Sequence, residues 1–146
     1  MARVDFYILD DGDAARFARF VCRLTEKAFT GGLRVFIRAP IADEQRRLDD
    51  MLWTFRQGSF VPHALASTSP THAEPVLIGE APAFDHNYDV VVNLADSIPA
   101  RYERFNRIAE VVRADVSSKE TARHRFRVYR DAGLEIFSHK VESERA

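Results

Sequence analysis

Three carboxylates stand directly after the first apolar segment of the chain, at a position where small enzymes can hold a metal ion. Residues 4–9 read VDFYIL, and Asp10, Asp11 and Asp13 follow, with one glycine between them. Carboxylate oxygens in such a position bind Mg²⁺ in enzymes that transfer phosphoryl groups. A small metal-dependent phosphotransferase is therefore one candidate function. The alternative, which we favour, is that Asp13 caps a helix and that its neighbours interact with the positive helix N-terminus.

The same turn does not fit a dinucleotide-binding site. The fingerprint of such a site needs several glycines so that backbone amides can approach the pyrophosphate, and this turn has only Gly12. The three carboxylates would also repel that anion. The chain contains neither a P-loop of the form GxxxxGKS or GxxxxGKT nor a GxSxG motif. The sequence therefore predicts no nucleotide site.

The other residues with catalytic or metal-binding chemistry are scattered. Five histidines occur, and none has the HxxxH, HExxH or Cys-His spacing of a metal site: His63, His72, His86, His124 and His139. The single cysteine, Cys22, lies near the apolar face of a predicted helix, as expected of a small buried hydrophobe. The sequence predicts a non-catalytic protein without a cofactor or a bound metal.

A stripe of basic residues marks the last predicted helix. Its members are spaced four, four and three residues apart, which places them within about 80° of one another: Lys119, Arg123, Arg127 and Arg130. Phe126 lies at the edge of the stripe, and Tyr129 lies farther round the helix. One interpretation is a solvated face beside aromatic residues of the core. The other is a groove for an acidic peptide with a hydrophobic end, because arginine suits planar carboxylates.

A direct single-stranded nucleic-acid binder is a further possibility for the same stripe. Such binders spread aromatic platforms along a groove, and this chain lacks that pattern. Its 146 residues include 21 basic and 22 acidic ones, so there is no basic excess for holding phosphates. We therefore expect contact with DNA to be indirect.

A second candidate surface combines Trp53, at the end of a predicted helix, with the loop that follows it. The loop contains the segment SFVPH, with Phe60, Val61, Pro62 and His63. An aromatic residue followed by an apolar loop can cover the core. It can equally form an exposed patch on which a partner protein anchors. The pattern leaves both interpretations open.

The composition is that of a soluble globular protein. No apolar run approaches the roughly 20 residues that cross a bilayer, and a single cysteine allows no disulfide framework. The N-terminal segment turns acidic straight after its short apolar run, unlike a signal peptide. We expect a cytoplasmic protein that does not contact membranes.

Strand-like and helical segments alternate along the chain. Strands are predicted at residues 4–9, 33–37, 75–78, 88–94, 108–112 and, as a short strand or an extended tail, 134–137. Helices are predicted at residues 14–30, 42–53, 96–106 and 117–132. The second helix is expected to turn Ile41 inward, and the last to begin with a capping box of Ser117 and Glu120. The proline-containing stretch at residues 59–75 is expected to be irregular.

This alternation predicts an α/β fold. We expect a three-layer α/β/α sandwich around a mostly parallel, Rossmann-like sheet without a nucleotide site. Residues 1–138 are expected to form a single domain, and residues 139–146 a charged tail that frays.

Several segments together resemble the chi subunit of bacterial DNA polymerase III holoenzyme, an accessory subunit of its clamp loader. The resemblance spans nearly the whole chain and rests on DFYIL, LDDMLW, SFVPHAL, PVLI, VVNL and RHRFRVYRDAG, within residues 5–9, 48–53, 59–65, 75–78, 91–94 and 123–133. Its most specific feature is the order LW, then SFVPH, then a YRxxG ending after a basic helix. The resemblance implies an α/β fold without nucleotide or catalysis, in a replisome protein of the nucleoid.

The resemblance also implies two binding sites. One holds the acidic C-terminal tail of single-stranded-DNA-binding protein, and its positions match Lys119, Arg123, Phe126 and Arg127, with Tyr129 and Arg130 close by. The other binds the psi subunit of the clamp loader or a repair helicase, and its positions match Trp53, Phe60, Val61, Pro62 and His63. The chain departs from the family at Phe126, where tyrosine is common, and in a shortened link between Val112 and the last helix.

Overall fold

The computed structural model describes residues 2–69, 73–81 and 87–142. Its strands are β1 (Arg3–Leu9), β2 (Val35–Arg38), β3 (His63–Leu65), β4 (Val76–Gly79), β5 (Val90–Asn93), β6 (Arg107–Val112) and β7 (Glu135–Val141). Its helices are α1 (Ala14–Thr30), α2 (Ala42–Thr54) and α3 (Val116–Asp131), with a short 3₁₀ helix, η1 (Tyr102–Arg104). The strands form one sheet in the order β3-β4-β2-β5-β6-β1-β7, and all six neighbouring pairs are parallel.

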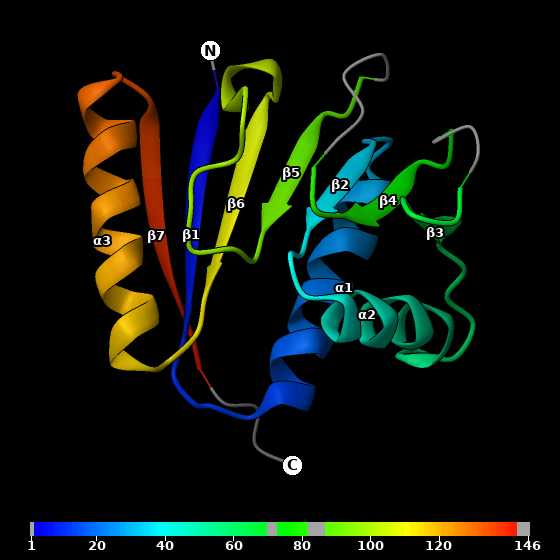
Figure 1. Ribbon diagram of the computed structural model, residues 1–146. Coiled ribbons are helices and arrows are strands. Elements are labelled where there is room, and N and C mark those ends of the chain that lie inside the picture. The colour runs from blue at the N-terminus through cyan, green and yellow to red at the C-terminus, as the bar shows by residue number, and fades with distance from the viewer. Residues whose placement is uncertain (1, 70–72, 82–86, 143–146) are drawn as a thin grey trace.

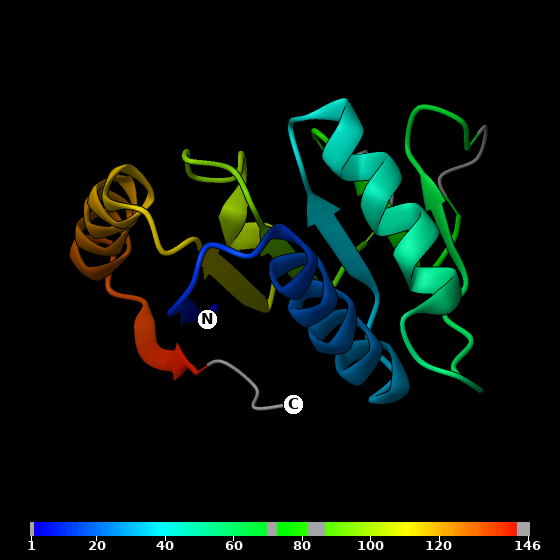
Figure 2. The ribbon, with the colours of Figure 1, turned by 90° about the horizontal axis from the view of Figure 1, so that it is seen from below.

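The helices cover different halves of the two faces of the sheet (Figures 1 and 2). On one face, α1 packs on β2 and β5 and α2 packs on β3 and β4, whereas α3 packs on β6 and β7 from the other face. Each face has its own apolar core, one under α1 and α2 and one that includes residues of α3. The predicted three-layer α/β fold is confirmed, and the sheet is parallel throughout the described strands.

The first loop holds its acidic residues in structural contacts. The Asp13 side chain caps α1 by accepting hydrogen bonds from the backbone amides of Ala15 at 2.9 Å and Arg16 at 3.3 Å. Asp11 accepts a hydrogen bond from the Asp13 amide and pairs with the Arg16 guanidinium at 3.3 Å. The favoured interpretation of Asp13 as a helix cap is therefore confirmed.

The largest difference from prediction is the last strand. β7 runs to Val141 and pairs in register with β1 from Arg3 opposite Glu135 to Leu9 opposite Val141. The predicted domain boundary at residue 138 is therefore wrong, because it falls inside this strand. Its last residues, 139–141, resemble a charged tail because β7 lies at the edge of the sheet, where most of its side chains are exposed. Residues 143–146 lie outside the described part of the chain.

Other differences are local. Asp115, not Ser117, caps α3, and its side chain accepts a hydrogen bond from the Ser118 amide at 2.9 Å. Within residues 96–106 only η1 is helical, and the segment predicted to be irregular contributes β3. Ile41 points outward and is 60% exposed, because it precedes the first turn of α2 and does not lie on its buried face.

Candidate functional site

A groove runs along the outer flank of α3, above the strands at the edge of the sheet. Its volume is about 470 Å³. Its walls combine side chains from α3 with side chains from β1, β6 and β7: Phe6, Ile8, Val112, Lys119, Ala122, Arg123, Phe126, Arg127, Arg130 and Ser138. Five of the six residues predicted to bind an acidic tail therefore line one groove.

The floor of the groove is largely apolar. Phe6 and Ile8 of β1 point towards α3, and the Phe126 ring packs on Phe6 with 5.7 Å between the ring centroids. Ser138 stands opposite Phe6 in the register of β7 with β1. Its small side chain leaves space on the floor beside the two rings. An apolar side chain of a ligand can enter this space without losing hydrogen bonds.

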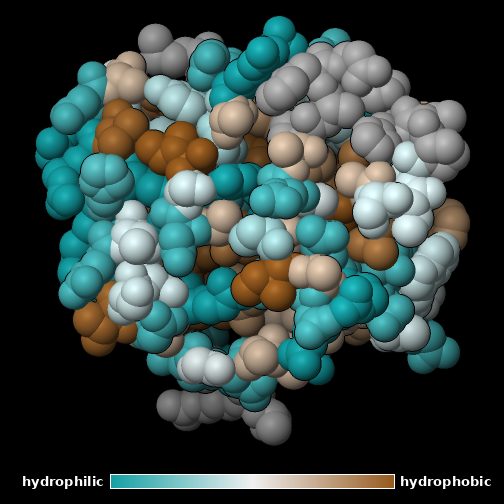
Figure 3. Space-filling view, in the orientation of Figure 1, coloured by the Kyte–Doolittle hydropathy of each residue, from teal (hydrophilic) through white to brown (hydrophobic). Residues whose placement is uncertain are grey.

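The rim of the groove is cationic. Within the described part of the chain, Lys119, Arg123 and Arg127 form no ion pair with an acidic side chain, and Arg130 pairs with its neighbour Asp131 at 3.1 Å. Arg123 and Arg127 are exposed. On the face shown in Figure 3, apolar residues form separate patches within a mostly hydrophilic surface. Because Lys119, Arg123 and Arg127 have no acidic partner among the described residues, the charges of the rim are available to an anionic ligand.

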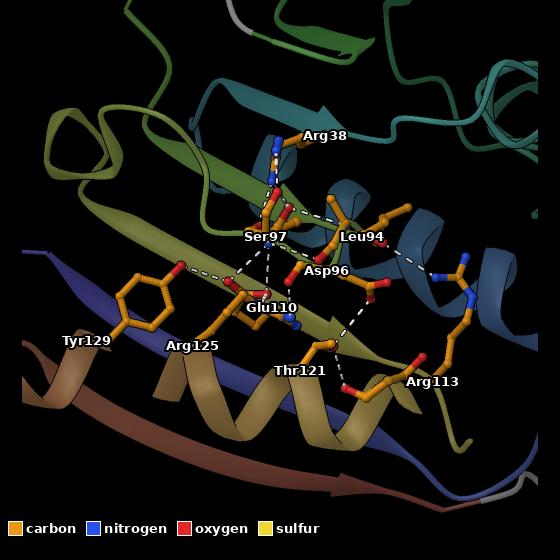
Figure 4. Close-up of polar contacts among 12 residues, drawn as sticks. Arg38, Leu94, Asp96, Ser97, Glu110, Arg113, Thr121, Arg125 and Tyr129 are labelled. Atoms are coloured by element: carbon orange, nitrogen blue, oxygen red, sulfur yellow. Dashed lines mark hydrogen bonds and ion pairs between the residues drawn. The ribbon is translucent and has the colours of Figure 1, made fainter. Parts of the chain in front are cut away.

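Tyr129 does not belong to the groove, and its prediction as a tail-binding residue is wrong. Its side chain is fully buried and donates a hydrogen bond to Glu110 Oε2 at 2.7 Å. Glu110, on β6, is also fully buried and accepts a hydrogen bond from Arg125 Nε at 3.0 Å (Figure 4). Three turns of α3 thus present cations outward, while Arg125 and Tyr129 bind a buried carboxylate on its inner side.

The contacts of Glu110 extend across the sheet. Asn93 Nδ2 of β5 donates to both carboxylate oxygens, at 2.9 and 3.1 Å. Arg38 of β2 donates to Asn93 Oδ1 at 3.1 Å, and Arg125 Nη1 donates to the Asp96 carbonyl at 2.8 Å. Burial raises the pKa of Glu110, whereas Arg125, Tyr129 and Asn93 favour its charged form. Nothing in the local pattern around Glu110 or Arg125 had singled them out, because their partners are distant in sequence.

The second predicted surface is smaller than expected. Trp53 is 53% exposed and Phe60 is 67% exposed, with 6.0 Å between their ring centroids. Val61 is buried, and so is His63, whose two ring nitrogens lie 2.6 Å from the Val61 carbonyl and 2.9 Å from the Asp49 carbonyl. The centroids of the His63 and Trp53 rings lie 4.6 Å apart. Val61 and His63 therefore support an exposed pair of aromatic rings beside the partly buried Pro62.

Comparison with known proteins identifies the family. The model of the family described as "DNA polymerase III chi subunit, HolC" matches residues 1–137. The chain belongs to the DNA polymerase III chi subunit family. This confirms the resemblance predicted from the sequence motifs.

Curated members of the chi family match nearly the whole chain. The DNA polymerase III subunit chi of Pseudomonas aeruginosa is 33% identical over 141 residues, covering 97% of this chain and 98% of that protein. The Escherichia coli subunit is 31% identical over 142 residues, covering 93% and 96%. The crystal structure of T4 UvsW has a similar fold, with a TM-score of 0.68 at 8% identity over 97% of this chain and 41% of that one. At that identity the likeness concerns the fold alone.

The alternative site at the acidic turn has no metal geometry. Among residues 2–69, 73–81 and 87–142, no group of three or more His, Cys, Asp or Glu side chains could hold a metal ion. His72 and His86 lie outside the described residues.

Burial raises the pKa of the Cys22 thiol to about 12, as expected of a cysteine that only fills the core. No helix of the described chain is long and apolar enough to span a membrane.

A buried carboxylate also ties β7 to β1. Asp5 is 1% exposed, accepts hydrogen bonds from Arg3 at 3.0 and 3.1 Å, and lies 2.9 Å from Nε2 of His139. Burial acts to raise the pKa of Asp5, but the hydrogen bonds from Arg3 and His139, together with the positive charges of Arg3 and Arg107, outweigh it and lower the pKa below its usual value. β7 is therefore held to β1 by side-chain contacts as well as by backbone hydrogen bonds.

Proposed function

We propose that this chi-family protein is a non-catalytic adaptor of DNA replication. It links the clamp loader of DNA polymerase III to single-stranded-DNA-binding protein by holding the acidic C-terminal tail of that protein. The observation that carries the proposal is the groove on α3, in which the cations of α3 lie along an apolar floor. Family membership supports the polymerase as the assembly to which the chain contributes.

The chemistry of the groove matches that of the proposed ligand. Arg123 and Arg127 present planar guanidinium groups, which form paired hydrogen bonds with aspartate or glutamate carboxylates. The floor between Phe6, Phe126 and Ser138 accepts a hydrophobic side chain at the end of the tail. An acidic ligand therefore gains charge pairing along the rim and apolar burial at its tip.

Binding of the tail would connect the polymerase assembly to single-stranded DNA that is coated with its binding protein. Single-stranded DNA coated with its binding protein displays many identical tails at once. Weak capture of several tails in turn raises the local concentration of the polymerase at the exposed strand, through effective concentration alone. DNA is then contacted indirectly, in agreement with the net charge of −1.

A titration of the full chain with synthetic tail peptides tests this function. We expect saturable binding of a short aspartate-rich peptide ending in phenylalanine, weakening as salt is added. The same peptide without its terminal phenylalanine is expected to bind at least about tenfold more weakly, since the loss of a buried aromatic side chain costs more than 1.4 kcal/mol. Stronger binding of a single-stranded oligonucleotide than of the peptide would instead favour a direct nucleic-acid binder.

The exposed pair Trp53 and Phe60 is proposed as the contact with the clamp loader. Its partner is the psi subunit, or a repair helicase that uses the same patch. Adjacent exposed aromatic rings are typical anchors of protein interfaces. Trp53 lies in the last turn of α2 and Phe60 in the loop that follows, away from the helix that carries the groove. One protein can then hold a tail and the polymerase assembly at the same time.

The substitution Trp53→Ala is expected to weaken binding to purified psi subunit, or to the helicase, by roughly tenfold, as for an interface anchor. Calorimetric titration measures this effect. Phe137→Ala is the matched control, because Phe137 is another exposed aromatic residue, on β7. Tail-peptide affinity is expected to stay unchanged in the Trp53 variant. Equal affinity of the Trp53 variant and the unaltered chain for both partners would contradict this assignment.

A further inference from the structure

The outer edge of the sheet next to the groove is unpaired. β7 is the last strand in the sheet order, and within the described residues it pairs only with β1. Its seven residues are exposed or partly exposed, with none buried. Along a strand, the amide and carbonyl groups of alternate residues point to the side that lacks a partner. Such an edge can accept another extended chain.

The groove follows this edge. Ile136, Ser138 and Lys140 stand opposite Val4, Phe6 and Ile8, whose side chains point to the α3 face. Side chains of β7 at these positions therefore also face α3. Ser138 lies on the groove floor, and the cations of α3 lie above it. A peptide aligned with β7 would pass beneath the basic rim along its whole length.

We infer that the acidic tail binds as an extended strand added to the free edge of β7. The inference rests on the proposed function and specifies its binding mode. A run of like charges disfavours a helix, so the tail approaches in extended form. Main-chain hydrogen bonds to β7 then supply affinity. Alternate side chains of the tail point to the α3 face. There the carboxylates of the tail reach Arg123 and Arg127, and its hydrophobic end enters the floor of the groove.

The opposite edge of the sheet lacks these features. β3 has three residues, His63–Leu65, of which His63 is buried and the other two are partly buried. Beside it lies α2, whose Asp49 carboxylate stands 3.3 Å from Nε2 of His63. An acidic strand would meet this carboxylate there. Charge complementarity therefore selects β7 as the edge that receives the tail.

A backbone-methylation scan of the peptide tests the inference. Each residue of an aspartate-rich peptide ending in phenylalanine is N-methylated in turn, which removes one amide donor and leaves the side chain unchanged. We expect affinity to fall about two- to tenfold at every second position and little at the positions between, as for loss of single hydrogen bonds. The alternation is the signature of strand pairing, because only alternate amides face the neighbouring strand.

Hydrogen exchange of the full chain supplies the second measurement. Saturating unmodified peptide is expected to slow exchange at alternate amides of residues 135–141, while the amides of β3 serve as the control. The added strand would be overturned if affinity fell equally at every methylated position, or at none, and if hydrogen exchange in β7 stayed unchanged. The proposed function would then remain intact. No binding of the unmodified peptide would overturn the proposed function itself, and this inference with it.

Discussion

Replacing Glu110 by alanine is expected to lower the free energy of unfolding by about 3–5 kcal/mol, because it leaves a buried charge without its partner. Glu110 is fully buried, and Arg125, which it holds at 3.0 Å, is 3% exposed. Tyr129 also loses the acceptor of its hydroxyl hydrogen bond. Urea unfolding followed by circular dichroism measures the change. A loss of this size is a large part of the stability of a domain.

Two further variants test whether the loss of stability comes from the buried charge of Arg125, left without its partner, or from removal of a glutamate side chain as such. Glu120→Ala removes an exposed glutamate from α3 and is expected to change stability by less than about 0.5 kcal/mol. The double variant Glu110→Gln with Arg125→Met removes both charges and is expected to recover part of the stability that Glu110→Ala loses. A Glu110→Ala protein as stable as the unaltered chain would show that the carboxylate does not hold α3 on the sheet.

The substitution Arg123→Ala is expected to weaken binding of the acidic tail peptide by roughly 1.5–3 kcal/mol, or about 12- to 150-fold, as for a charged hydrogen bond. Arg123 lines the groove, is exposed, and has no acidic partner among the described residues. The cost of its removal therefore falls on ligand binding and not on folding. Calorimetric titration at low salt measures the effect, which is expected to shrink as salt screens the charges.

Controls for this variant come from the same chain. Arg46→Ala makes the same change of charge on α2, where Arg46 pairs with Asp43 at the surface, and is expected to leave tail binding unchanged. Arg123→Lys keeps the charge without the planar fork and is expected to retain only part of the affinity. Equal affinity of the Arg123→Ala protein and the unaltered chain would remove Arg123 from the site.

Local sequence patterns determined most of the elements of this fold. The helical spacing of apolar residues and the cap at Asp13 predicted α1, and the apolar run at residues 88–94 predicted β5. The spacing of Lys119, Arg123 and Arg127 predicted the basic face of α3. These features depend on residues within a few positions of one another, so that the geometry of a single helix or strand is sufficient to place them.

The tertiary structure decided the features that depend on distant residues. Tyr129 and Arg125 turn inward because Glu110 lies beneath them, and Phe6, Ile8 and Ser138 form the groove floor because β1 and β7 are neighbours. Residues 138–141 continue β7 because β1 offers them a free edge. Spacing along one element indicates which side chains share a face. What that face meets depends on how the sheet is ordered, and in this protein the order places the first and last strands, β1 and β7, side by side.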